Sequence, residues 1–424
     1  MRARREGETS ERGGVSEESE GRAGDANGNG APDTATTGMR RTARRRIALV
    51  LGGGGLKGFA HIGVLQALEE RGITPAVYAG TSIGALMATA HAAGVSTGEM
   101  AERAERLRRR DLFRINHVGM IVDRMRSASL YLEEPLRALV RSVVPHRRLR
   151  DLPVPVLVNT VDLERGTQVV WGLPGLDDVW ADEAVYASCS LPGFFPPGRV
   201  KGRTCVDGGV VDNLPVSFPQ VLGVDAVIAV DVGTTELAHA RDIAAQGFAA
   251  VFMRAATTMM STLQGHHLVQ RRGIPTLYVR PQIVGMDWFA FGRAGELVER
   301  GRRAAEEALL ELDRCTEADE GLFPLRKVRL EVERARCIGC GICVALAPDV
   351  MRLDARGKAV PPGHELVWSP VAGEFVRHCP TQAITVADLS EPGLHEWSEF
   401  PAPQQVRRPR IRRRDGADGG PRES

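Results

Sequence analysis

The sequence has few aromatic residues, few cysteines and no long apolar run. Phe, Trp and Tyr make up 5% of the 424 residues, so a platform for stacking nucleic-acid bases is not expected. Seven cysteines are far fewer than a disulfide scaffold uses. No apolar stretch approaches the roughly 20 residues of a membrane-spanning helix. These absences exclude several classes and leave an ordinary globular protein.

The net charge and the N-terminal residues exclude two further classes, nucleic-acid-binding proteins and proteins with a secretory signal. Lys and Arg number 55 and Asp and Glu number 53, which leaves a net charge of +2 and no overall basic field for nucleic acid. Arg2, Arg4 and Arg5 are not followed by the apolar core of a secretory signal. We therefore expect a cytoplasmic protein that binds no nucleic acid.

Both ends of the chain lack the large apolar groups needed for a core. Residues 1–45 are rich in Gly, Arg, Glu, Ser and Thr, and residues 387–424 are rich in Pro, Gly and Arg, so both are predicted to be disordered. Two basic clusters lie there, Arg40–Arg46 and Arg407–Arg414. They indicate peripheral contact with an anionic membrane, although a solvated tail explains them equally well.

Between these ends, short apolar runs alternate with helical patterns. This alternation predicts an α/β domain over residues 46–315, with helices packed on a mostly parallel sheet. The last helix of this domain is expected at about Gly295–Cys315, followed by a linker over 316–327 and a small second domain over 328–386. The expected strands are Ile47–Leu51, Ala76–Ala79, Val154–Val158, Gln168–Trp171, Ala226–Val230 and Thr276–Val279.

Residues Gly80–Gly84 read Gly-Thr-Ser-Ile-Gly and fit the G-x-S-x-G nucleophile elbow. Such an elbow exposes a serine, here Ser82, on a tight turn between a strand and a helix. Gly80 and Gly84 flank the serine because larger side chains would clash in that turn. The five-residue pattern alone is weak, and an ordinary glycine-rich turn is the alternative, but the order of strand, elbow and helix strengthens the prediction.

A second glycine-rich loop, Gly52–Gly58, also follows a strand and opens a helix. Gly53, Gly55 and Gly58 formally match the dinucleotide-binding pattern, but the acidic residue expected about 20 positions later is missing. We therefore expect no nucleotide cofactor. Free N–H groups at such a helix start can instead hold a developing oxyanion.

The third element is Asp207-Gly208-Gly209. Asp-Gly is a common turn dipeptide, so a structural role is a strong alternative. The functional interpretation places the Asp207 carboxylate on a loop where it accepts the Ser82 proton.

Together these motifs resemble the patatin-like phospholipase family over roughly residues 46–310. The resemblance includes the segment Ala187–Pro197 and the sequence Asn213-Leu214-Pro215 after the aspartate. It implies a three-layer α/β/α hydrolase and a lipid or other long-chain acyl ester as substrate. It also implies a Ser–Asp dyad of Ser82 and Asp207 without histidine, with an oxyanion hole at Gly53, Gly54 and Gly55.

A catalytic histidine is the competing hypothesis. His239, His266 and His267 follow Asp207 in the order of an α/β-hydrolase triad, but His266 and His267 lie in a polar stretch without a strand immediately before them. His61, on the first predicted helix, is interpreted as structural.

The rarest pattern is Cys337-x2-Cys340-x2-Cys343, followed by Cys379-Pro380. This close triplet with one distant thiolate is typical of an iron–sulfur cluster, whereas zinc usually takes two separated pairs. Residues Val328–Val386 resemble bacterial single-cluster ferredoxins of α+β fold, which implies one [4Fe–4S] cluster held by Cys337, Cys340, Cys343 and Cys379. Cys189, Cys205 and Cys315 are left over, the first two as expected buried thiols near the hydrolase site.

The sequence thus predicts a serine lipid acyl hydrolase that carries an iron–sulfur domain of structural or redox-sensing role. The alternative is an electron-transfer or redox-sensing protein, with a redox partner, whose patatin-like domain binds lipid without significant turnover.

Overall fold

The structure, a computed structural model, describes residues 45–115, 129–233, 247–270, 274–283, 286, 288, 290–318, 321–361, 365–369 and 373–389. The two segments predicted to be disordered lie outside these residues, except for Arg45 and 387–389. The arginine cluster Arg407–Arg414 lies wholly outside them, as does Arg40–Arg46 apart from its last two residues. Among the described residues, no helix is both long enough and apolar enough to cross a membrane.

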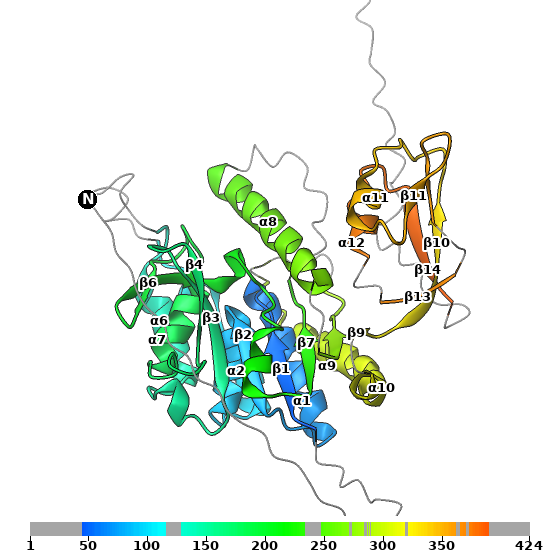
Figure 1. Cartoon of the computed structure of the whole chain (residues 1–424). Helices are drawn as coiled ribbons and strands as arrows, with labels where there is room; N and C mark the ends of the chain where they lie inside the picture. Colours follow the sequence, from blue (N-terminus) through cyan, green and yellow to red (C-terminus); the bar gives the residue numbers. More distant parts are fainter. Residues whose placement is uncertain are drawn as a thin grey trace, which may run out of the picture. The chain divides into compact units, whose positions relative to one another are not determined.

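A nine-stranded mixed sheet forms the first domain (Figure 1). Its main order is β5-β6-β3-β2-β1-β7-β8-β9, and β4 pairs with β3. Six neighbouring strands are parallel, namely β3, β2, β1, β7, β8 and β9. Strands β4 and β6 run antiparallel to β3. The strands are β1 (Ile47–Leu51), β2 (Val77–Thr81), β3 (Val156–Asp162), β4 (Thr167–Trp171), β5 (Gly198–Val200), β6 (Arg203–Asp207), β7 (Ala226–Val230), β8 (Thr276–Val279) and β9 (Leu322–Phe323).

Helices cover this sheet. The α-helices are α1 (Ala60–Glu70), α2 (Ile83–Ala92), α3 (Thr97–Arg106), α4 (Arg109–Leu112), α6 (Glu133–Val143), α7 (Ala181–Cys189), α8 (Phe248–Gln270), α9 (Ala294–Ala308) and α10 (Leu312–Glu317). Short 3-10 turns are η1 (Gly55–Phe59), η3 (Leu149–Asp151), η4 (Gly208–Val210), η5 (Phe218–Leu222) and η7 (Leu309–Glu311).

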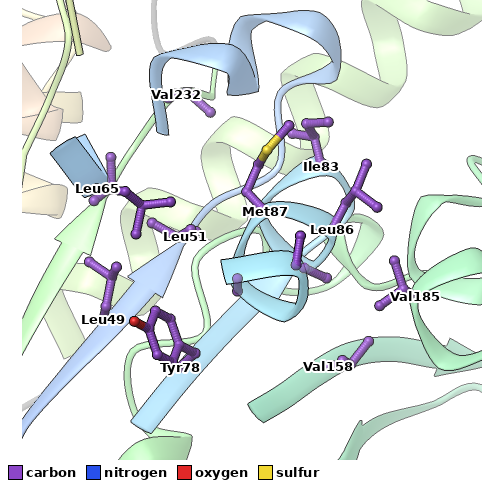
Figure 2. Packing of buried hydrophobic residues seen from close by; sticks show 14 of the residues in the cluster. Leu49, Leu51, Leu65, Tyr78, Ile83, Leu86, Met87, Val158, Val185 and Val232 are labelled. Atoms are coloured by element: carbon purple, nitrogen blue, oxygen red, sulfur yellow. The ribbon is translucent and has the colours of Figure 1, made fainter. Parts of the chain in front are cut away.

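The apolar core lies on both faces of the sheet. Side chains alternate along a strand, and on β1 Leu49 and Leu51 enter one hydrophobic cluster while Ala48 and Val50 enter another. Figure 2 shows the first cluster, where Leu49 and Leu51 lie near Leu65 of α1 and the apolar side chains of α2. Burial on both faces explains why the parallel strands are almost continuously apolar, and it confirms the predicted α/β/α arrangement.

The second domain has its own small core. Its sheet has the order β13-β10-β14 and is antiparallel, and β11 pairs with β12 in a short hairpin. Val328, Leu330, Phe375 and Val386 lie in its hydrophobic cluster. The elements are β10 (Arg326–Val332), α11 (Ile342–Leu346), β11 (Arg352–Leu353), β12 (Ala359–Val360), β13 (Leu366–Trp368), α12 (Glu374–Arg377) and β14 (Ile384–Asp388).

The expected strands at Ile47–Leu51, Ala226–Val230 and Thr276–Val279 coincide with β1, β7 and β8. The segment expected as a linker, 316–327, contains the end of α10, strand β9 and the start of β10. Because β9 pairs with β8, part of this segment extends the sheet of the first domain.

Candidate active site and cysteine pocket

Ser82 lies on a sharp turn between β2 and α2, as the G-x-S-x-G pattern predicts. Its backbone has φ 55° and ψ −126°, an uncommon conformation for a residue other than glycine. A Cβ on Gly84 would come within 2.0 Å of the Leu51 carbonyl oxygen, and one on Gly80 within 2.5 Å of the Gly84 carbonyl carbon. The turn therefore needs glycine at both positions.

Strand pairing places Asp207 at the same end of the sheet as Ser82. Thr81, the last residue of β2, pairs with Asn159 of β3, and the next β3 residue, Thr160, pairs with Asp207 at the end of β6. The Ser82 hydroxyl lies close enough to the Asp207 carboxylate to lower the pKa of that carboxylate. The structure thus brings together the two residues that the sequence predicts as a pair.

The Asp207 carboxylate is almost completely buried, with 2% of the residue exposed. Burial raises its pKa to about 6, against the hydrogen bonds from the Ser82 hydroxyl and the Gly209 N–H, which lower it. The Gly209 N–H donates to Asp207 Oδ1 at 2.8 Å. A carboxylate with this pKa is a stronger base than a solvent-exposed aspartate and is still ionised at neutral pH.

The Ser82 backbone is fixed by residues to which the sequence assigns no role. The Ser82 N–H donates to Ser188 Oγ at 2.9 Å, and the Ser188 hydroxyl donates to the Asn159 carbonyl oxygen at 2.7 Å. Ser188 lies on α7, inside the segment Ala187–Pro197 that carries part of the family resemblance. The motif located this segment, but only the fold shows that its serine supports the elbow.

The glycine-rich loop lies directly against Ser82. A Cβ on Gly53 would be 3.3 Å from Ser82 Cβ and 2.5 Å from Asn213 Oδ1. Asn213 holds this loop through two hydrogen bonds. Its side-chain amide donates to the Gly53 carbonyl oxygen at 3.0 Å, and its backbone carbonyl oxygen accepts from the Gly53 N–H at 3.3 Å. The loop is therefore tied to the segment that follows Asp207.

The three predicted oxyanion donors differ in their surroundings. The Gly53 N–H is engaged with Asn213, whereas Gly54 and Gly55 stand at the start of η1, where N–H groups have no partner within the helix. Within the described parts of the chain, no backbone hydrogen bond engages the N–H of Gly54 or Gly55.

The remaining motif glycines permit close packing around the same turn. A Cβ on Gly58 would lie 2.3 Å from the Ile83 side chain, and one on Gly208 would lie 2.5 Å from the Asn159 side chain. Gly58 thus lets η1 approach the start of α2, and Gly208 lets the loop after Asp207 approach β3.

The described histidines have other partners. His61 is buried, its Nε2 donates to the Gly52 carbonyl oxygen at 2.8 Å, and burial lowers its pKa to about 4. His267 Nδ1 lies 3.5 Å from Asp212 Oδ1. His239 and the His266 side chain lie outside the described parts, and within these parts no hydrogen bond joins a histidine to Ser82 or Asp207.

The three cysteines outside the predicted cluster set are held as neutral thiols. Burial raises the pKa of Cys205 to about 11 and that of Cys315 to about 12. Burial and the nearby Asp207 carboxylate together raise the pKa of Cys189. Cys189 therefore lies near the serine and aspartate pair, as expected, but it is partly exposed and not fully buried.

In the second domain, one pocket is lined by all four predicted cysteine ligands, Cys337, Cys340, Cys343 and Cys379. Gly339 and Gly341, both with positive φ, shape the loop between the first three. No three His, Cys, Asp or Glu side chains of the described residues are grouped for a single metal ion. Four thiols that line one pocket are a donor set that fits an iron–sulfur cluster.

Backbone N–H groups point at two of these sulfurs. The Ala383 N–H lies 3.3 Å from Cys379 Sγ, and the Ala359 N–H lies 3.5 Å from Cys337 Sγ. Burial alone would raise the pKa of Cys379, but the hydrogen bonds to its sulfur outweigh it and the pKa is lowered. Hydrogen bonds to sulfur are also the groups that tune a bound cluster.

Comparison with protein families matches both parts of the chain. Residues 49–218 match the family model of patatin-like phospholipases, and residues 330–367 match that of a 4Fe–4S single cluster domain. The second match ends before Cys379, which the fold brings to the same pocket as the first three cysteines.

Among curated proteins, an uncharacterized NTE family protein of Mycobacterium tuberculosis is 36% identical over 211 residues, 50% of this chain and 56% of the relative. The lysophospholipase nte1 of Aspergillus fumigatus is 29% identical over 328 residues, 68% of this chain and 19% of that protein. The chain thus spans about half the length of the first of these relatives and much less of the second.

Matches among solved structures include VipD from Legionella pneumophila, at 16% identity and a TM-score of 0.35 over 65% of this chain and 67% of that one. ExoU, in its complex with SpcU from Pseudomonas aeruginosa, has 17% identity and a TM-score of 0.32 over 65% and 53%. The chain is thus similar to patatin-like phospholipases over residues 49–218 and to 4Fe–4S single-cluster domains over residues 330–367.

Proposed function

We propose that this protein is a serine hydrolase of lipid acyl esters, of phospholipase A or acyl esterase type. The observation that carries the proposal is the proximity of the Ser82 hydroxyl, on a strained elbow, to the buried Asp207 carboxylate. The lysophospholipase relatives support a lipid as the substrate class.

In the proposed reaction, Ser82 Oγ attacks the ester carbonyl carbon while Asp207 takes the hydroxyl proton. The carbonyl oxygen becomes an oxyanion, which accepts hydrogen bonds from the Gly54 and Gly55 N–H groups, with the Gly53 peptide holding the loop in place. The intermediate then expels the alcohol, which takes the proton from Asp207 and leaves an acyl group on Ser82.

Water completes the cycle. Asp207 accepts a proton from the water as it attacks the acyl carbon, and Ser82 leaves with that proton as the fatty acid is released. One oxyanion donor is typically worth about 2.7–4 kcal/mol of transition-state stabilisation, so two backbone donors supply a large part of the acceleration that a carboxylate base cannot.

In the second domain we propose that Cys337, Cys340, Cys343 and Cys379 hold one [4Fe–4S] cluster. The presence of all four cysteines in the lining of one pocket and the N–H groups directed at two of their sulfurs support this assignment. When bound, such a cluster supplies one-electron chemistry or a structural cross-link. Ester hydrolysis moves no electrons, so the hydrolase residues work without it.

The second candidate function is electron transfer or redox sensing through a redox partner, with a lipid-binding hydrolase domain of no significant turnover. The exposed Cys340 at the edge of the pocket favours this candidate, since an exposed ligand brings a cluster close to a partner. We place the protein in the cytoplasm, with peripheral contact to anionic membranes through its arginine-rich ends.

A p-nitrophenyl ester assay separates the two functions. Ser82→Ala and Asp207→Ala should each remove nearly all activity while the fold and the visible absorbance of the second domain remain. A double variant, His266→Ala with His267→Ala, should keep most of the activity. If the double histidine variant is as inactive as Ser82→Ala, the dyad is wrong; if the wild type shows no serine-dependent turnover, the second candidate stands.

A further inference from the structure

Helix α8 carries a stripe of exposed apolar side chains along one face. Val251, Met259 and Leu263 are 43%, 59% and 38% exposed. They are spaced by eight and four residues, so they lie on one side of the helix. At 1.5 Å per residue, the stripe from Val251 to Leu263 is about 18 Å long. Phe252, 37% exposed, widens it at its first turn.

The opposite face of α8 lies against the proposed catalytic residues. Met260 and Gln264 are buried, and a Cβ on Gly209 would be 2.8 Å from Met260 Cε and 3.1 Å from Asp207 Oδ1. Gln264 Oε1 accepts a hydrogen bond from the Asn213 amide at 3.1 Å, the same amide that bonds to the Gly53 carbonyl oxygen. One helix therefore separates the active site from the exposed apolar stripe.

The composition of α8 is also unusual for an exposed helix. Arg254 is its only charged residue among 23, and it contains no Asp or Glu. No acidic side chain of this helix would repel anionic headgroups, and Val, Phe, Met and Leu side chains are the type that inserts at the boundary of headgroups and acyl chains. Figure 1 shows α8 as one long helix that projects beyond the sheet.

We propose that the face of α8 formed by Val251, Phe252, Met259 and Leu263 docks the hydrolase domain on a phospholipid surface. The inference rests on the proposed function, because a lipid-binding face next to the active site is useful only if the substrate is a lipid. Docking there would place Asp207 and Ser82 one helix thickness from the membrane. It differs from contact through the arginine-rich ends, because apolar insertion is not weakened by salt.

Vesicle binding without turnover tests this surface. Every protein carries Ser82→Ala so that the vesicles stay intact, and binding to neutral phosphatidylcholine vesicles is measured by co-sedimentation at about 0.5 M NaCl, where exposed charges are screened. Met259→Glu with Leu263→Glu should weaken binding about tenfold or more, because carboxylates are costly at the acyl boundary. Leu310→Glu, at a residue of η7 that is 73% exposed, is the matched control and should bind as the parent does.

Further measurements keep the result unambiguous. With Ser82 intact, the α8 double variant should hydrolyse a water-soluble p-nitrophenyl ester within about twofold of the wild-type rate, since its side chains face away from Asp207. If the glutamates unfold the protein, Met259→Gln with Leu263→Gln replaces them.

Two binding results would overturn the proposal: no binding of the parent to neutral vesicles, or equal binding of the parent and the α8 variant. A third would be a change from dimer to monomer in the variant without an effect on vesicle binding, because a second copy of the chain would then cover the stripe. If the wild type does not hydrolyse the water-soluble ester, that result would instead count against the proposed function alone.

Discussion

Asp207 combines two properties that oppose each other, burial and the need to be ionised. Because the pKa of Asp207 is about 6 in the folded protein, its carboxyl group is protonated below about pH 6 and ionised above it. The nearby titratable group, Cys189, has a raised pKa and stays neutral in this range, so it adds no second step. A single carboxylate therefore controls the pH dependence of the proposed base.

We predict that kcat/KM for a soluble ester rises with pH through about 6 and falls about tenfold per pH unit below that value. The reason is that only ionised Asp207 can accept the Ser82 proton. The profile should be measured between pH 4.5 and about 8 with circular dichroism as a control for unfolding. An inflection near 4, as for an exposed aspartate, would contradict the burial argument.

The same burial should cost stability. The folded pKa of Asp207 lies above its unfolded value of 3.8, so folded molecules bind the proton more tightly and stability declines as pH rises from about 4 to about 6. Asp207→Asn removes the buried charge and keeps an acceptor for the Gly209 N–H. It should raise the free energy of unfolding by at most about 3 kcal/mol at pH 8, with little gain near pH 4, while abolishing activity.

Asp182→Asn is the control for that stability measurement. Asp182 is also buried, but it accepts hydrogen bonds from His146 Nδ1 at 2.9 Å and Arg141 Nε at 3.2 Å. Removing a paired buried charge should lower stability at pH 8 instead of raising it. Calorimetry at both pH values compares the two variants, and a loss of stability in both at pH 8 would show that the buried Asp207 charge does not destabilise the fold.

Sequence motifs locate Ser82, Asp207 and the glycine loop because each requires a particular residue type at a fixed local spacing. They do not reveal Ser188 or Asn213 as supports of the site. Ser188 bonds to the Ser82 N–H across 106 residues, and Asn213 bonds to Gly53 across 160 residues. Such contacts depend on the tertiary fold, which leaves no signal at a local spacing.

At the scale of elements, the strands with apolar residues on both faces are the best predicted. Helix α8 is the element least visible in the sequence, where its second half has the composition of a polar stretch. Its pattern is mixed, because polar Gln264 and Thr257 are buried together with Met260 and Leu268, while Met259 and Leu263 face outward. A helix with apolar residues on both its buried and its exposed side gives no clear amphipathic signal, and the exposed apolar residues form the proposed lipid-docking face.

The packing of α1 on α9 depends on two glycines. A Cβ on Gly63 would lie 1.8 Å from the Val298 carbonyl oxygen, and one on Gly301 would lie 1.9 Å from the Ala60 carbonyl oxygen. The two helix backbones therefore approach more closely than any side chain would allow.

We predict that Gly63→Ala lowers the free energy of unfolding by about 1–3 kcal/mol, because the helices must separate to admit the methyl group. The control is Gly98→Ala in α3, where a Cβ would meet nothing within 4 Å. It should raise stability by about 0.5–1 kcal/mol, since alanine is the better helix former. Urea unfolding with unchanged m-values compares the two, and equal effects would refute the close approach of α1 and α9.

At the scale of the whole molecule, each domain has its own core. The cluster around Val328, Phe375 and Val386 contains Cys337 and Cys343, whereas the clusters on the two faces of the large sheet contain no residue of the cysteine pocket. The small domain has few large side chains, and thiolate ligation adds folding energy to such a domain. We therefore favour a structural role for the proposed cluster over a sensing role.

Replacing Cys340 by Ser should then unfold residues 330–386 and leave serine esterase activity largely unchanged, because no hydrolase side chain takes part in that pocket. Limited proteolysis, visible absorbance and the ester assay follow the three consequences. Cys315→Ser, which changes a buried thiol outside the pocket, should keep the absorbance.

A sensing role predicts instead that the intact protein hydrolyses ester at rates differing several-fold between dithionite-reduced and air-oxidised states. Equal rates in the two states would exclude the sensor, and a rate that follows redox state while the absorbance shows no loss of cluster would exclude the structural role.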